Sequence, residues 1–301
     1  MRLMHLQLLR AIAQTGSLRA AAEAMHLSQP ALTKALRQLE MEFGAALVVR
    51  SSRGARLAPA GELLAARADI ALRELERGRE EVAWHVEQTR ASLSIGVSPA
   101  AAAMLVPATL ARFAARWPTV QVRVVDTLYP RAFSQLRAGE IDIAIGPLNE
   151  AADSHDIHLE ALFASETVVV ARKGHALARA QRLQALVDAP WVMTGPASGP
   201  GDPVRLGIWP DEDQARRAPL ACESFSTLLA VVRELDHLAV VPRGFFEYYG
   251  PPLGLMRLPI RDPLPVLRVY AMTRADAPLT LPAQRLLDAF REESRRLIPP
   301  V

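Results

Sequence analysis

The spacing of apolar side chains near the N-terminus predicts two short helices. After Ser17, apolar positions fall three or four residues apart at Leu18, Ala21, Ala22 and Met25, as on one face of a helix. Ser17 is a suitable N-cap for this helix. Residues 26–27 then turn the chain toward a second helix.

The second predicted helix has one apolar and one polar face. Ser28 can cap it, and Pro30 fits its first turn, where a missing N–H is harmless. The apolar face consists of Leu32, Leu36, Leu39 and Phe43. The polar face carries Gln29, Thr33, Lys34 and Arg37. Such a helix can read base edges in the major groove and hold phosphates, as in a helix-turn-helix.

Two short extended runs, at residues 45–50 and 55–57, follow Gly44 and flank a Ser/Arg/Gly turn. This pattern predicts a β-hairpin wing. Its tip carries Arg50, Arg53 and Arg56, which can enter a narrow minor groove. A small helical domain with a solvated basic face remains the alternative interpretation.

The charge distribution supports the DNA-reading interpretation. Residues 1–58 contain eight basic and three acidic groups, whereas residues 59–90 contain five basic and seven acidic groups. The positive charge therefore lies where phosphates would be neutralised.

The 301 residues suit about two domains and a linker. With a single cysteine, Cys222, no apolar span of about 20 residues and no secretion signal, we expect a cytoplasmic protein.

Residues 59–89 predict one long helix with a heptad seam. Small and apolar side chains recur at alternating spacings of four and three residues, and the last position is a histidine. The positions are Leu64, Ala68, Ala71, Leu75, Gly78, Val82 and His85. A second copy of the helix is the simplest partner for this seam, since a dimer would address two DNA half-sites. Packing of the helix against its own chain is the alternative.

From residue 92 onward, strands alternate with helices, which predicts an α/β sheet and two lobes with a ligand cleft. We expect strands at residues 93–97, 120–125, 141–145, 167–171, 238–241 and 266–272, and helices ending at 116 and over 133–138, 204–208, 226–235 and 282–297.

Several residues in this region are candidates for chemistry. Ser98 ends the first strand and could help to bind an anion or simply cap a helix. Residues 194–201 form a ligand loop or a connector. The spacing of His155 and His158 allows a metal site, but a solvated loop is favoured, and Cys222 is better explained as a buried thiol than as an oxidant sensor. No base–nucleophile pair is recognisable, so we expect no catalytic residue, no metal and no enzyme.

Taken together, these motifs resemble the LysR-type transcriptional regulators along nearly the whole chain. The matching pieces are Gly16-Ser17-Leu18, Ala20-Ala21-Ala22, Leu27-Ser28-Gln29-Pro30-Ala31-Leu32-Thr33, Leu39-Glu40, Phe43-Gly44, Leu47-Val48-Val49-Arg50 and Leu57-Ala58-Pro59-Ala60-Gly61, with weaker matches at Leu136-Arg137-Ala138-Gly139, residues 141–146 and Leu238-Ala239-Val240-Val241-Pro242.

The resemblance implies a fold and an assembly. The fold is an N-terminal all-α winged helix-turn-helix (1–58), a linker and dimerisation helix (59–90) and a two-lobed α/β effector domain like periplasmic binding proteins (91–301). The function implied is a sequence-specific DNA-binding regulator that bends promoter DNA and responds to a small-molecule inducer. A homotetramer built as a dimer of dimers, with RNA polymerase as a further partner, is also implied.

The residue pattern and the resemblance together give the expected site residues. The expected DNA-binding residues are Ser28, Gln29, Pro30, Thr33, Lys34, Arg37, Arg50 and Arg53. The expected effector-binding residues are Ser98, Tyr129, Thr194, Ser198 and Phe225. Tyr129 is bulkier than the small hydroxyl residue usual in the family, and residues 233–237 replace its usual glycine-containing turn.

The effector itself is expected to be a small organic molecule, with no other cofactor. Three arginines, Arg131, Arg205 and Arg243, lie in segments that could approach the cleft, so we expect an aromatic or carboxylate anion. A solute-binding transport component is the alternative function, and an enzyme that uses the cleft for catalysis is a further one.

Overall fold

The computed structural model describes residues 1–51, 54–87, 91–148, 152–195, 204, 209 and 220–297. The chain divides into two compact units, an N-terminal unit (1–87) and a C-terminal unit (88–301). Among the described residues, no helix combines the length and apolar character needed to cross a membrane.

The N-terminal unit opens with the predicted helices. Ser17 Oγ accepts a hydrogen bond from the Ala20 amide at 3.4 Å, and Ser28 Oγ accepts one from the Ala31 amide at 3.3 Å. Both serines are therefore the predicted N-caps. Gly44 ends the third helix in the left-handed conformation, with φ 62°. The helices are α1 (Leu3–Thr15), α2 (Leu18–Ala24) and α3 (Gln29–Phe43).

The apolar stripe of α3 is buried for most of its length. Leu32, Leu36 and Leu39 pack in one core with side chains of α1 and α2. The prediction was wrong for Phe43, which is 46% exposed. Phe43 is the last residue of α3, and the chain reverses at Gly44 directly after it. The stripe therefore runs one residue beyond the core.

The predicted wing is an antiparallel hairpin of β1 (Val48–Ser51) and β2 (Gly54–Leu57). It is attached to the end of α1, because the Ala55 amide donates to the Gly16 carbonyl at 2.9 Å. A Cβ on Gly54 would lie 2.6 Å from the same carbonyl oxygen. Only glycine therefore fits at this close approach.

Glu40 connects α3 to the wing. Its Oε1 accepts hydrogen bonds from the Leu47 amide at 2.9 Å and the Val48 amide at 3.3 Å. These two amides begin the wing, and without Glu40 they would lose a charged acceptor. The Glu40 carboxylate thus links the orientation of α3 to the position of the wing.

The long helix α4 (Pro59–Glu87) changes its surroundings along its length. Near its start, Ala68 and Leu72 pack against Leu6 of α1. Beyond them, Leu75 is 51% exposed and Val82 is 63% exposed.

The predicted heptad seam is therefore divided between two environments. Its first positions, Leu64 and Ala68, pack against the chain's own helices, as the alternative interpretation supposed. The later positions are exposed, namely Ala71, Leu75, Gly78, Val82 and His85.

In the C-terminal unit, seven of the described strands form one sheet in the order β10-β6-β11-β5-β3-β4, with β9 also paired to β6. Strands β3, β4 and β5 run parallel to one another, whereas β11 runs antiparallel to β5 and β6. Their bounds are β3 (Ala91–Val97), β4 (Val120–Asp126), β5 (Ile143–Pro147), β6 (Ile157–Arg172), β9 (Ala239–Pro242), β10 (Leu255–Arg257) and β11 (Val266–Arg274).

Strand β6 runs through both lobes of this unit. Its first part, residues 157–166, pairs with β11, and its second part, residues 167–172, pairs with β9 and β10. We call the part built on β3, β4, β5 and β11 lobe 1, and the part built on β9 and β10 lobe 2. Lobe 2 also contains η1 (Leu183–Leu186), α8 (Phe225–Glu234), α9 (Arg243–Tyr249) and a parallel pair, β7 (Val192–Thr194) and β8 (Leu220–Cys222).

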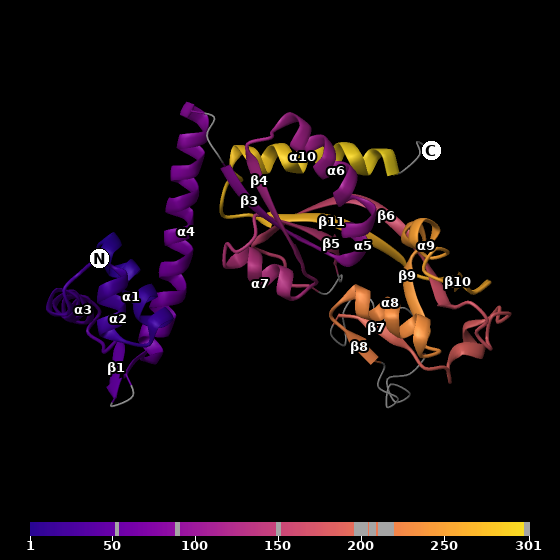
Figure 1. Ribbon diagram of the computed structural model, residues 1–301, viewed down its shortest axis with the longest axis horizontal. Coiled ribbons are helices and arrows are strands. Elements are labelled where there is room, and N and C mark those ends of the chain that lie inside the picture. Colours follow the sequence, from indigo (N-terminus) through magenta and orange to yellow (C-terminus); the bar gives the residue numbers. More distant parts are fainter. Residues whose placement is uncertain are drawn as a thin grey trace. The chain divides into compact units, whose positions relative to one another are not determined.

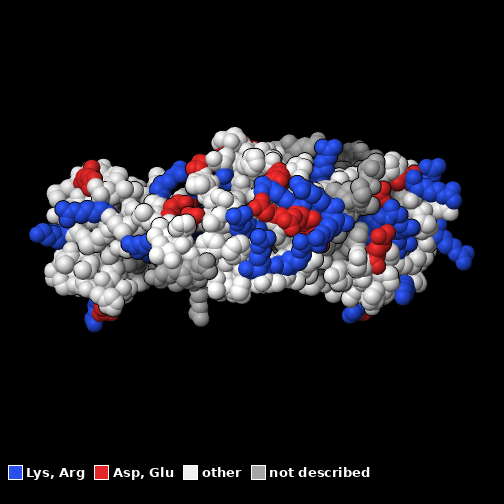
Figure 2. Space-filling view, turned by 90° about the horizontal axis from the view of Figure 1, so that it is seen from above, with Lys and Arg blue, Asp and Glu red and all other residues white. Residues whose placement is uncertain are grey.

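Helices cover both faces of the lobe 1 sheet. Figure 1 shows α6 and α10 on one side and α7 on the other, and their apolar side chains enter separate cores. In Figure 2 basic and acidic side chains gather on the face of the molecule that α6 and α10 form. Ion pairs made by these helices include Arg112 with Glu292 at 3.1 Å and Arg291 with Glu160 at 2.6 Å. The helices are α5 (Pro99–Met104), α6 (Val106–Arg116), α7 (Arg131–Arg137) and α10 (Leu281–Leu297).

Some predicted elements differ in the structure. The helix expected to run to residue 116 is broken at Leu105, because Pro107 enters the first turn of α6 and removes an N–H donor. The strand expected at 167–171 is the second part of the longer β6. Of the helix expected at 204–208, only Val204 lies within the described residues, in a turn. Residues 243–249 form α9, which the sequence did not predict.

Replacement of Glu40 by alanine tests the connection between α3 and the wing. We expect Glu40→Ala to lower the free energy of unfolding of the N-terminal unit by about 1–3 kcal/mol, because two amides lose their acceptor. Chemical denaturation of the full chain measures this. Glu23→Ala, which breaks only the exposed 3.0 Å pair with Arg19, is the control and should cost less than about 0.5 kcal/mol. Equal losses in both variants would contradict the assigned role of Glu40.

Candidate nucleic-acid interface and ligand cleft

The polar face of α3 is free of the core. Gln29, Pro30, Lys34 and Arg37 are exposed and Thr33 is half-buried. They lie opposite the buried leucines, since positions four apart share one helix face. The structure thus places these predicted DNA-binding residues on one accessible surface. Ser28, at the start of the same helix, is also exposed and uses its hydroxyl as the N-cap.

The acidic groups of the first 58 residues all have other partners. Glu23 pairs with Arg19, Glu40 binds the wing amides, and Glu42 pairs with the N-terminal ammonium of Met1 at 2.5 Å. Among the described residues, Lys34 and Arg37 form no ion pair with any carboxylate. Their charges are therefore available for phosphates.

The predicted arginines of the wing are only partly described. Arg56 is exposed on β2. The backbone of Arg50 pairs with Ala55 in the hairpin, and Arg53 lies outside the described residues.

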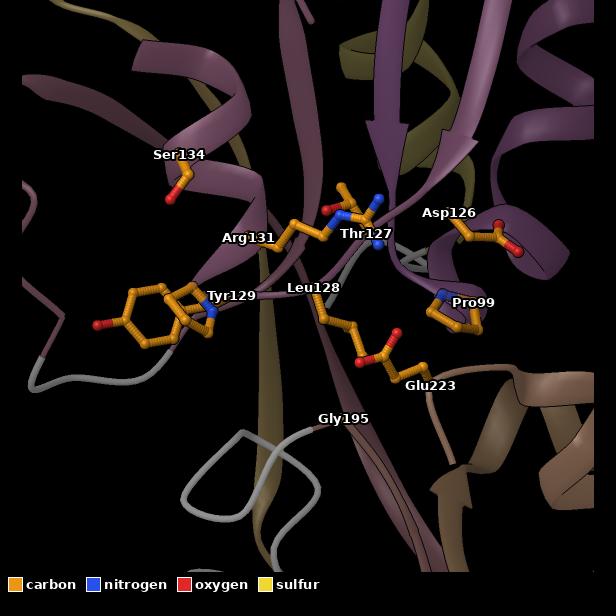
Figure 3. A pocket seen from close by; sticks show the side chains of 10 residues that line it. Pro99, Asp126, Thr127, Leu128, Tyr129, Arg131, Ser134, Gly195 and Glu223 are labelled. Carbon is orange, nitrogen blue, oxygen red and sulfur yellow. The ribbon is translucent and has the colours of Figure 1, made fainter. Parts of the chain in front are cut away.

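A second candidate site is a cavity of about 370 Å³ in the C-terminal unit. Residues of both lobes line it, and Figure 3 shows the side chains around it. Lobe 1 contributes most of them, and lobe 2 contributes two. The lining residues are Pro99, Asp126, Thr127, Leu128, Tyr129, Pro130, Arg131, Ser134, Gly195 and Glu223.

The topology of the strands explains this position. Asp126 is the last residue of β4, which runs parallel to β3, and α7 begins a few residues later at Arg131. In lobe 2, Gly195 and Glu223 directly follow the parallel strands β7 and β8. Ligands of α/β sheets commonly bind at the carboxyl ends of parallel strands. The cavity lies at such ends in both lobes.

The predicted effector residues are distributed unevenly around the cavity. Tyr129 lines it. The described lining does not include Ser98, which is buried and caps α5 through the Ala101 amide at 3.3 Å. Thr194, one residue before Gly195, and Phe225 are also absent from the described lining. The Phe225 ring packs edge-on against the Phe245 ring in lobe 2, with the two centroids 4.7 Å apart. Ser198 lies outside the described residues.

Two of the three candidate arginines can be located. Arg131 lines the cavity. Arg243 does not, because it pairs with Glu166 and, at 3.1 Å, with Glu247. Arg205 lies outside the described residues.

Sequence reasoning missed Asp126, Thr127 and Glu223, which all line the cavity. A signal for them was present, since each stands at or directly after the carboxyl end of a strand. Glu223 was the hardest to find, because its strand β8 has only three residues.

Two other candidates have simple explanations. Burial raises the pKa of the Cys222 thiol, so its reactive thiolate is disfavoured. His155 is an exposed residue whose ring lies 2.7 Å from Asp153, and this hydrogen bond raises the pKa of His155. No cluster of three metal-ligating side chains occurs in the part of the chain that the structure describes.

Comparison with known proteins relates both units to one family. The family model described as "Bacterial regulatory helix-turn-helix protein, lysR family" matches residues 3–62, and "LysR substrate binding domain" matches residues 87–295. The transcriptional regulator TdcA of Escherichia coli (strain K12) is 26% identical over 290 residues, which cover 96% of this chain and 92% of TdcA. The regulator PcaQ of Agrobacterium fabrum is 26% identical over 297 residues, covering 97% and 95% of the two chains.

A solved structure shows the same fold. Full-length CbnR complexed with its target DNA has a TM-score of 0.68 at 19% identity, covering 99% of this chain and all (100%) of that chain. The matched domains establish that this chain belongs to the LysR family of DNA-binding transcriptional regulators, with an N-terminal helix-turn-helix domain and a C-terminal effector-binding domain.

Proposed function

We propose that this chain controls transcription by placing α3 in the major groove of a promoter duplex, with the wing beside it. The observation that carries the proposal is the accessible polar face of α3. On that face Lys34 and Arg37 have no carboxylate partner in the described structure, while every nearby acid is engaged elsewhere. Gln29 and Thr33 share the face and can bond to base edges.

We propose further that a small organic effector binds in the cavity between the lobes and changes the DNA-bound state. The cavity draws side chains from both lobes, and β6 runs through both. A ligand that contacts both lobes favours whichever lobe arrangement fits it, which shifts the population of conformations. No other cofactor is proposed.

The proposed assembly is a homotetramer, built as a dimer of dimers. It is supported by an apolar groove on α4, which includes Leu75, Val82 and Val86 together with Leu3 of α1. An exposed apolar surface along a long helix is a typical contact for a second copy. We place the protein in the cytoplasm, where promoter DNA and RNA polymerase, its proposed further partner, are accessible.

Other functions are less well supported. The relatives reported above are transcriptional regulators, so a transport component is not supported. An enzyme would need turnover of a bound compound, and the sequence offers no recognisable base–nucleophile motif in its support.

Substitutions on α3 separate phosphate contacts from base reading. We expect Lys34→Ala to weaken binding to all duplexes. The slope of the logarithm of the binding constant against the logarithm of the salt concentration should become shallower by about 0.9 for each bound subunit whose Lys34 contacts a phosphate. We expect Gln29→Ala to reduce discrimination between promoter and scrambled duplexes by about 1–3 kcal/mol. Fluorescence anisotropy titrations of the full chain at several salt concentrations measure both.

Lys173→Ala is the matched control, because Lys173 is the other lysine of the chain and is exposed in the C-terminal unit. Its salt slope should equal that of the unmodified protein. An unchanged slope for Lys34→Ala, or full discrimination by Gln29→Ala, would refute the proposed binding mode.

A charge in the α4 groove tests the assembly. Val82 is 63% exposed within the groove, so Val82→Glu should not unfold the unit but should disfavour pairing of two copies. We expect at least a tenfold weaker dimer by sedimentation equilibrium, since a buried unpaired charge costs more than about 1.4 kcal/mol. Ala66→Glu, at an exposed position of α4 outside the groove, is the control. The groove is not the interface if both variants associate equally well.

A further inference from the structure

We infer that the effector of the cleft is a zwitterion, a free α-amino acid whose carboxylate binds Arg131 and whose ammonium group binds Glu223 and Asp126. This inference rests on the proposed function, because it assumes that the cavity is the effector site. Its basis is the pair of opposite charges that face one small cavity from the two lobes.

The three ionisable groups have no competing partners. Within the described residues, Asp126, Arg131 and Glu223 form no ion pair, and all three are exposed. Several other arginines of the same unit are bound to carboxylates, as in the pair of Arg137 with Asp156 at 2.7 Å. The charges of the cavity are therefore available to a ligand.

The arrangement of these charges favours a ligand with two charges of opposite sign. In Figure 3 the Arg131 side chain extends toward Thr127, and the Glu223 carboxylate points from lobe 2 toward Leu128. Two carboxylates and one guanidinium give the described lining an excess of negative charge. A plain carboxylate would satisfy Arg131 but leave both acids without a counter-charge, and a plain amine would leave Arg131 unmatched.

Thr127 provides an independent indication of a polar ligand. It is 6% exposed, and its hydroxyl has no hydrogen-bond partner among the described residues. Its methyl group is packed over Gly96, where an added Cβ would lie 2.5 Å from Cγ2. A buried hydroxyl normally has a partner, and because Thr127 lines the cavity, a polar ligand group there is a candidate for that partner.

The remaining lining fits the apolar body of such a ligand. Pro99, Leu128, Pro130 and the ring of Tyr129 provide apolar surface. The Tyr129 ring is held edge-on against Phe133, with their centroids 5.3 Å apart. The volume of about 370 Å³ is at the small end of ligand pockets, which suits a single amino acid. The sequence predicted an aromatic or carboxylate anion, and the cavity adds the ammonium group to that prediction.

The zwitterion also connects binding with regulation. Arg131 belongs to lobe 1 and Glu223 to lobe 2. A ligand that binds Arg131 at one end and Glu223 at the other joins the two lobes, whereas a carboxylate without an ammonium group would be held by Arg131 of lobe 1 alone. The two opposite charges would thus select the arrangement in which the lobes are closest.

Thermal unfolding of the full chain with matched probes tests this inference. The probes are the standard L-amino acids, each measured singly. For phenylalanine and leucine, the matched compounds without the amine are 3-phenylpropanoate and 4-methylpentanoate, and those without the carboxylate are 2-phenylethylamine and 3-methylbutylamine. We expect at least one amino acid to raise the Tm, and the singly charged probes to leave it unchanged.

Variants of the cavity identify the groups responsible. For the stabilising amino acid, Glu223→Gln and Arg131→Gln should each weaken binding about tenfold or more, because each removes one charge-assisted contact. Glu247→Gln changes a carboxylate outside the cavity, paired with Arg243, and should bind like the unmodified protein. Unchanged affinity in both cavity variants would overturn the assignment.

Two further outcomes would overturn it: a Tm raised as much by the deaminated acids as by the amino acids, or no rise with any amino acid. Binding of promoter duplex, measured on the same samples, separates this inference from the proposed function. A chain that binds DNA but no amino acid retains its function and loses this ligand class. A chain that binds an amino acid but no DNA retains this ligand class and loses the proposed DNA-binding function.

Discussion

The burial of the leucine stripe of α3 is the constraint on which the rest of the account depends. Because Leu32, Leu36 and Leu39 lie in the core, the polar positions of the same helix must face outward. Glu40 then links the helix to the wing through two backbone amides, so that the two candidate DNA contacts form one surface. The engagement of all three nearby acids leaves that surface positively charged.

The N-terminal unit could be predicted almost completely because its signals are local. These signals are the serine N-caps, a glycine in the left-handed conformation and apolar side chains spaced three and four residues apart. Each of them depends only on residues within a few helical turns. Phe43 shows the limit of this reasoning, since periodicity gives a face but not where the core ends. The heptad seam of α4 shows the same limit, because spacing does not tell which partner covers each part.

The cleft was less predictable because residues far apart in the sequence build it. Asp126 and Glu223 are separated by nearly one hundred positions, and only the folded topology brings them to one cavity. Ser98 was a plausible ligand residue, but its hydroxyl serves its own helix. Local motifs therefore predicted the helices and the hairpin that carry the candidate DNA contacts, whereas the charges that face the cavity from the two lobes could be identified only in the structure.

Hydrogen–deuterium exchange of the full chain, with and without a promoter duplex, tests the central claim most directly. If α3 enters the groove, DNA should slow exchange of amides at the start of α3 and in the β1–β2 hairpin, while amides of α6 and α10 exchange as before. Protection confined to the C-terminal unit, or no protection at α3 under conditions where the duplex is bound, would contradict the account.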